Sequence, residues 1–75
     1  MNELVQLARS LGFRFKSADL MVRRDGAALL LGRAGDFAFR RPDGSFDQCR
    51  AQFCSYHRME PFQFAVAILK QEFDV

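Results

Sequence analysis

The first residues of the chain carry apolar side chains at the spacing of an α-helix. Four of them recur three and four positions apart and therefore share one helical face: Leu4, Leu7, Ala8 and Leu11. Asn2 is a good N-terminal cap for this segment, and Gly12 stands where a glycine often follows the end of a helix. The pattern predicts a short amphipathic helix over residues 3–11.

The spacing then changes to the two-residue period of β-strands. Apolar and polar residues alternate strictly over 13–16, and a second strand is expected over 20–24, after a turn at 17–19. Asp25 and Gly26 predict a two-residue type I′ hairpin turn, which needs a positive φ at both positions.

Further strands are expected beyond this turn. Residues 27–31 are apolar throughout, which is typical of a strand at the centre of a sheet. Residues 37–41 alternate again, and the turn residues at 42–44 end the segment. Together these segments predict an antiparallel meander of three or four strands.

Two interpretations stay open for the residues after this meander. Ser45 and Gln48 have the spacing of a capping box, and several later side chains share a helical face, which favours a helix over 47–58. The alternative is a strand over 46–53 that continues the sheet.

The last segment predicts a second C-terminal helix that begins at Pro61, since proline fits the first helical position. Its apolar residues form two neighbouring stripes, one of Phe62, Ala65, Val66, Leu69 and Phe73 and one of Phe64 and Ile68. A helix that is apolar around most of its circumference needs cover on two sides.

The predicted fold class is therefore α+β. An N-terminal helix precedes a three- to four-stranded antiparallel β-meander, and two C-terminal helices pack on one sheet face. All 75 residues are expected to form a single domain (residues 1–75). A chain of this size buries only about 60% of its unfolded surface, so a partner that covers leftover apolar surface is expected to stabilise it.

Localisation and catalysis are limited by what the sequence lacks. The longest apolar run, 64–69, is far shorter than a membrane helix, and no signal peptide precedes the first helix, so a cytoplasmic protein without a membrane partner is expected. Cys49, Cys54 and His57 would not converge on a metal ion if they lie on a helix. We expect no metal, no other cofactor and no enzymatic activity.

The arginines suggest a charged surface instead. The net charge is +2, and nine of the eleven basic residues are arginine, which suits bidentate contacts to carboxylate or phosphate. If Phe13, Phe15, Phe37 and Phe39 point into the core, the alternating basic residues point the other way. This predicts a basic sheet face formed by Arg14, Lys16 and Arg40 together with Arg23, and Arg41 is a further residue expected to bind acidic groups of a partner. The simpler alternative is an ordinary solvated polar face.

Surplus apolar surface near the C-terminus favours protein binding. Tyr56 and Phe64 are expected as apolar anchors, because aromatic residues are enriched at interfaces. The sequence thus predicts a small regulator, inhibitor or adaptor, of the kind that phages and mobile elements encode, which binds a larger protein or complex stoichiometrically. A homodimer through the last helix is an additional option. The alternative function is a nucleic-acid-binding module that uses the basic sheet face.

Overall fold

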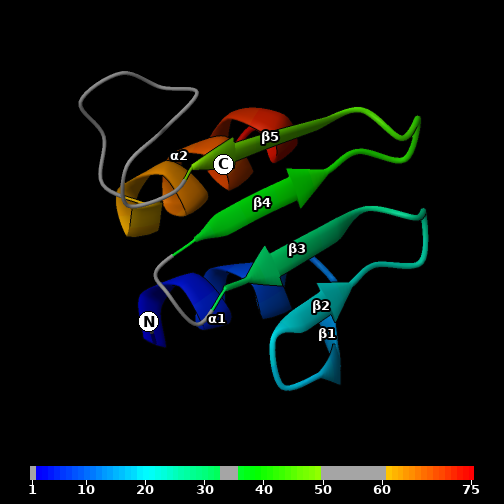
Figure 1. The fold of residues 1–75 in the computed structure, drawn as a ribbon, viewed down its shortest axis with the longest axis horizontal. Helices are drawn as coiled ribbons and strands as arrows, with labels where there is room; N and C mark the ends of the chain where they lie inside the picture. The colour runs from blue at the N-terminus through cyan, green and yellow to red at the C-terminus, as the bar shows by residue number, and fades with distance from the viewer. Residues whose placement is uncertain (1, 33–35, 50–60) are drawn as a thin grey trace.

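A computed structural model describes residues 2–32, 36–49 and 61–75 of the chain. A helix opens the fold, five strands follow, and a helix ends it: α1 (Asn2–Ser10), β1 (Arg14–Ser17), β2 (Leu20–Val22), β3 (Ala28–Leu31), β4 (Phe37–Arg40), β5 (Phe46–Cys49) and α2 (Pro61–Phe73). The strands pair antiparallel in the order β1-β2-β3-β4-β5, so the sheet is a simple meander (Figure 1). The α+β class is confirmed.

Helix α1 ends in a hydrogen-bonded turn that leads directly into the sheet. The amide of Gly12 donates to the carbonyl of Arg9 (3.1 Å), and the amide of Phe13 donates to the carbonyl of Ala8 (3.0 Å). This pair of bonds is the Schellman motif, in which the two apolar residues at its ends also come into contact. Ala8 and Phe13 are both fully buried. The predicted helix over 3–11 is confirmed with its bounds shifted by one residue.

The core lies between the sheet and the two helices, which lie on the same side of it (Figure 1). Every second residue of the central strands points into this core: Met21, Leu29, Leu31, Phe37 and Phe39. Helix α2 contributes Phe64, Ala65, Ile68 and Leu69, and α1 contributes Leu4 and Ala8. Strand β3 occupies the centre of the sheet, as its apolar sequence predicts.

Three phenylalanine rings join the two ends of the chain to the middle of the sheet. The ring of Phe73, at the end of α2, stands edge-on to those of Phe13 and Phe39, with centroids 5.9 and 6.1 Å apart. The rings of Phe13 and Phe39 are 6.5 Å apart. Such tilted pairs contribute about 0.5–1.5 kcal/mol each beyond the area they bury.

The described residues form a sheet of five strands, where three or four are expected from the sequence. Residues 46–49 pair with β4 at all four positions, so the predicted helix over 47–58 is wrong at its start and the alternative of a fifth strand is confirmed there. The rest of that segment, 50–60, lies outside the described residues. Pairing with β4 outweighs the local helical spacing, because strand formation depends strongly on the neighbouring strand.

Two hairpin turns of the sheet share one geometry. In the first, the Arg23 amide donates to the Ala27 carbonyl (2.8 Å) and the Gly26 amide donates to the Arg23 carbonyl (3.1 Å). The Ala27 amide also donates to the side chain of Asp25 (3.0 Å). Gly26 has a φ of +97° and Asp25 has no positive φ, so the predicted type I′ turn is wrong. The loop has three residues with glycine last, the next most common hairpin connection.

The second turn, between β4 and β5, repeats these contacts. The Arg41 amide donates to the Ser45 carbonyl (2.8 Å), and the Gly44 amide donates to the Arg41 carbonyl (2.9 Å). Asp43 accepts the Ser45 amide (2.9 Å), as Asp25 accepts that of Ala27. The φ of Gly44 is +93°. Both turns thus depend on an aspartate acceptor followed by a glycine.

Replacement of Gly44 by alanine isolates the backbone strain of this turn, because a Cβ atom there would meet nothing within 4 Å. A left-handed conformation costs an L-residue about 1–2 kcal/mol. We expect Gly44→Ala to lower the free energy of unfolding by about 1 kcal/mol in urea denaturation. Gly44→Asn should cost less, since asparagine tolerates this conformation. Equal stability of wild type and Gly44→Ala would contradict this description of the turn.

Candidate functional site

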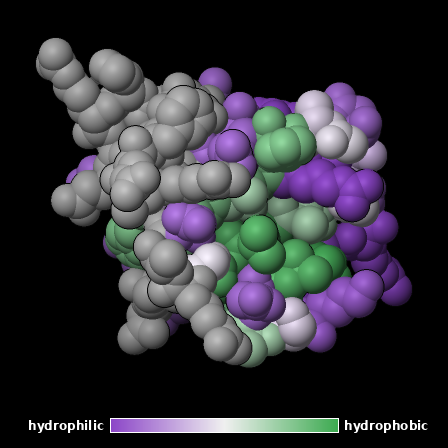
Figure 2. Space-filling model, viewed as in Figure 1, coloured by the Kyte–Doolittle hydropathy of each residue, from purple (hydrophilic) through white to green (hydrophobic). Residues whose placement is uncertain are grey.

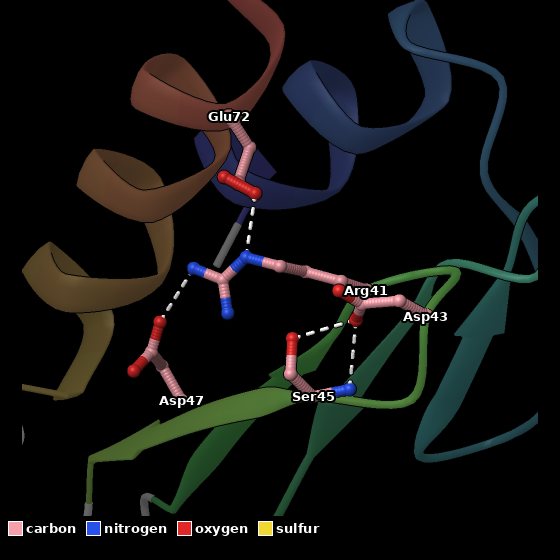
Figure 3. A network of polar contacts seen from close by, with 5 residues as sticks. All are labelled: Arg41, Asp43, Ser45, Asp47 and Glu72. Atoms are coloured by element: carbon pink, nitrogen blue, oxygen red, sulfur yellow. Dashed lines mark hydrogen bonds and ion pairs between the residues drawn. The ribbon is translucent and has the colours of Figure 1, made fainter.

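Of the residues predicted to bind a partner, Arg41 is held most firmly within the chain. Its Nε donates to Oε1 of Glu72 and its Nη2 donates to Oδ2 of Asp47, both at 2.6 Å (Figure 3). Its guanidinium carbon lies 5.6 Å from the ring centre of Phe39. The hydrogen bonds to Asp47 and then Glu72 raise the pKa of Arg41. Arg41 therefore links the β4–β5 hairpin to α2.

Arg14 and Arg23 are also directed toward other parts of the same chain. Nη1 of Arg14 donates to the carbonyls of Phe13 (2.7 Å) and Arg9 (3.1 Å), and Arg9 belongs to the last turn of α1. A cation is favourable at this end of a helix because unpaired carbonyls gather there. The guanidinium of Arg23 stacks over the Phe73 ring at 4.3 Å. The guanidinium groups of Arg14 and Arg23 thus pack against the C-terminal ends of α1 and α2, respectively.

The two aromatic anchors predicted from the sequence have different outcomes. Phe64 is fully buried between α2 and the sheet, so its side chain is not accessible to a partner. Tyr56 lies outside the described residues. Phe15 stays 42% exposed on the edge strand β1, partly covered by Arg9, although its neighbour in the register, Met21, is buried.

Lys16 and Arg40 are two of the predicted cations that border the sheet face opposite the helices, and Arg23 borders it as well. We call this surface the open face. In an antiparallel sheet, directly paired residues point to the same side. The register therefore places two rows across the open face. One row is Arg14, Val22, Ala28, Arg40 and Phe46, although the head group of Arg14 turns toward α1. The other is Leu20, Leu30, Ala38 and Gln48.

The centre of the open face is apolar. Leu30 is 44% exposed in the middle of the sheet, and Phe46 is 61% exposed beside Arg40. Leu20, Val22 and Ala28 are half-buried around Leu30. Figure 2 shows the resulting hydrophobic patch, bordered by hydrophilic residues. The expected basic or solvated polar face is thus, at its centre, a hydrophobic one.

The patch is also hollowed. The hollow has a volume of about 380 Å³ and is bordered by residues of β1 to β4 and the β2–β3 turn: Lys16, Leu20, Val22, Arg23, Gly26, Ala27, Ala28, Leu30, Ala38 and Arg40. Its described lining contains basic residues but no carboxylate, histidine, cysteine or hydroxyl group. The chemistry that it offers is hydrophobic contact with positive charge at the margins.

Other kinds of site have less support in the described part of the chain. Residues 2–32, 36–49 and 61–75 contain no group of three or more histidine, cysteine, aspartate or glutamate side chains placed to hold a metal ion. Neither α1 nor α2 has the length and apolarity that a bilayer crossing requires. The open face is the candidate functional site.

The sequence pattern does not predict the hydrophobic patch, although it contains one signal of it. Residues 27–31 lack the polar positions that a strand with one solvated face normally carries. A strand of this kind is covered on both faces, within its own chain or by another molecule. Leu30 belongs to such a strand and is nevertheless exposed.

Arg41→Lys should destabilise the fold, because one ammonium group cannot reproduce the two directed bonds of the guanidinium. We expect a loss of about 1–2 kcal/mol in the free energy of unfolding, the range of a partly exposed, charge-assisted pair. Arg40→Lys is the matched control, since Arg40 is exposed on the other face, and it should change stability by less than about 0.5 kcal/mol. Equal effects of the two substitutions in urea denaturation would contradict the role of Arg41.

Asp43 should titrate below its ordinary pKa of 3.8. The hydroxyl of Ser45 (2.7 Å) and then its amide (2.9 Å) donate to the ionised carboxylate and lower its pKa. The ionised form thus favours the folded state above pH 3.8, and this contribution is lost as the pH falls through the lowered pKa. Carboxyl NMR titration should show Ser45→Ala raising the pKa of Asp43. An unchanged pKa would exclude the hydroxyl as its main cause.

Comparison with known proteins adds neither a family nor a fold relative. No protein-family model, no curated protein and no solved structure matches this chain. The function must therefore be inferred from the geometry of the described residues, above all from the open face.

Proposed function

We propose that this protein is a small binding domain that docks stoichiometrically onto a larger protein through the open face. The observation that carries the proposal is the exposed apolar surface of the open face, with Leu30 44% exposed at its centre and Phe46 61% exposed on the edge strand β5. Contiguous apolar patches rimmed by polar residues mark interaction surfaces in soluble proteins. The biological role would be that of a regulator, inhibitor or adaptor.

Burial supplies the driving force for such docking. Covering a leucine or phenylalanine side chain is worth about 1.5–3 kcal/mol relative to leaving it in water. Leu20 and Val22 stand beside Leu30 and would lose further contact with water in the same event. A small domain also gains stability whenever a ligand binds only its folded form. The partner would thus complete the core of this domain from the side that the helices leave open.

The lining of the hollow favours binding over catalysis. General acid–base and nucleophilic catalysis need a histidine, carboxylate, thiol or hydroxyl group near the reacting atoms. The described lining offers aliphatic side chains with Lys16, Arg23 and Arg40 at its margins. We therefore propose that the protein acts by binding to a surface of its partner and not by catalysing a reaction.

Nucleic-acid binding, the alternative expected from the sequence, has weaker support. It requires several cations directed at phosphates on one face. Arg14 and Arg41 donate instead to carbonyl and carboxylate groups of the chain itself. The described lining of the hollow between Lys16 and Arg40 is aliphatic and offers no ring on which a base could stack, and the exposed ring of Phe46 lies outside this lining, beyond Arg40 on β5.

Leu30→Ser tests the proposed docking. A partner captured from nuclease-treated lysate of the source organism would be purified, and its affinity measured for wild type and variants. We expect Leu30→Ser to weaken binding at least tenfold, because the interface loses most of a buried leucine.

Phe15→Ser is the matched control. Phe15 is exposed to nearly the same extent as Leu30 (42% against 44%) but lies on the helix side of the edge strand. We expect it to retain wild-type affinity. Unchanged affinity of a folded Leu30→Ser protein, or equal losses in both variants, would refute docking through the open face. Recovery of a partner only without nuclease would favour nucleic acid.

A further inference from the structure

The charges beside the hollow are placed on both sides of its apolar centre. Lys16 belongs to β1 and Arg40 to β4, and both border the hollow. Three strand spacings separate these two strands, which corresponds to about 14 Å. Between them, β2 and β3 present Leu20, Val22 and Leu30. The surface is thus an apolar strip with a cation along each side.

This width fits a helix that lies along the strands. An α-helix with its side chains is about 10–12 Å across, so residues on its two flanks reach β1 and β4 while its apolar stripe faces β2 and β3. Ala28 and Ala38 are small and leave room in the floor of the hollow. An extended peptide fits less well, because its backbone amides and carbonyls would stay unpaired over an apolar face. Packing a helix on a sheet face is a standard layer arrangement.

The same charges disfavour a second copy of this chain. Face-to-face packing of two copies would bring Lys16 and Arg40 of one copy against the same cations of the other. The open face is also small, about 20 Å across the strands and 13 Å along them. A single helix covers such a surface, whereas stable interfaces between globular proteins usually bury about 800 Å² on each partner.

We infer that the open face binds an amphipathic acidic helix of the partner protein. The apolar stripe of that helix packs on Leu30, and carboxylates on the two flanks of the helix pair with Lys16 and Arg40. This inference rests on the proposed function and adds the chemistry of the partner. The absence of any carboxylate from the described lining means that acidic groups of the partner would meet no like charge there.

Two helical peptides test the inference directly. Each has about 16 residues, is held helical by a side-chain staple, and carries leucines along one stripe. One has glutamates on both flanks of the stripe, and the other has lysines at the same positions. Binding to the full chain is measured by fluorescence anisotropy at low and high salt. We expect the glutamate peptide to bind about tenfold more tightly at low salt, with a smaller difference at high salt.

Two variants distinguish this result from nonspecific binding of the peptides. Lys16→Glu combined with Arg40→Glu should reverse the preference in favour of the lysine peptide, and Leu30→Ser should weaken both peptides. All three substitutions lie on the open face and leave the buried core unchanged. Equal binding of the two peptides to wild type, or an unchanged preference in the double variant, would overturn the inference.

The remaining outcomes separate this inference from the proposed function. If Leu30→Ser no longer binds the natural partner, but wild type binds the two peptides equally, docking through the open face would stand and the acidic helix would be refuted. Retention of the natural partner in Leu30→Ser would refute docking itself. Self-association of wild type that Leu30→Ser abolishes would assign the face to a second copy. Displacement of the glutamate peptide by a short single-stranded DNA would assign it to nucleic acid. Each of these last two results would overturn the inference.

Discussion

Both described helices pack on the same face of a five-stranded sheet, and the other features of the molecule depend on this one-sided cover. Helix α2 lies against β4 and β5, and α1 lies against α2. The side chains that point toward them form the whole buried core of the described residues. The opposite face of β2 and β3 is covered by neither of the described helices and carries aliphatic side chains. The same meander that creates the core therefore also creates the proposed binding surface.

The arginines show how the chain holds its single layer of helices in place. The guanidinium of Arg41 joins the β4–β5 hairpin to α2, that of Arg23 stacks on Phe73 near the end of α2, and that of Arg14 approaches the last carbonyls of α1. Each contact fixes a helix relative to the sheet. The outward positions of β2 and β3 carry aliphatic side chains, so the open face is hydrophobic at its centre and basic only at its margin.

Much of the fold can be predicted from local patterns. Both described helices and the first four strands follow from residue spacing, because period and turn residues determine local structure. Strand β5 does not, since Ser45 and Gln48 imitate a capping box and only pairing with β4 decides the outcome. The rotation of α2 is not predictable either. Its apolar residues surround most of the helix, and tertiary packing selects Phe64 for the core while Phe62 is only half-buried.

The candidate site is harder to predict than the fold. The alternation of apolar and polar residues correctly assigns Arg40 to the face opposite the core. It cannot predict the position of the guanidinium group at the end of a long, flexible side chain. The head groups of Arg14 and Arg23 turn toward carbonyls and a ring that only the folded chain brings near. The exposure of Leu30 depends on which sheet face the helices cover, and this is decided by contacts between distant segments.

The accessibility of the open face in solution is the most direct test of docking through this face. Methyl NMR with a soluble paramagnetic probe would report how closely water reaches Leu30 and Val22 in the free protein and in the complex. We expect strong relaxation of both methyl signals in the free chain and protection when the partner is bound, with Leu29 protected throughout. Methyl groups of Leu30 that are already protected in the free protein, or that stay accessible in the complex, would contradict it.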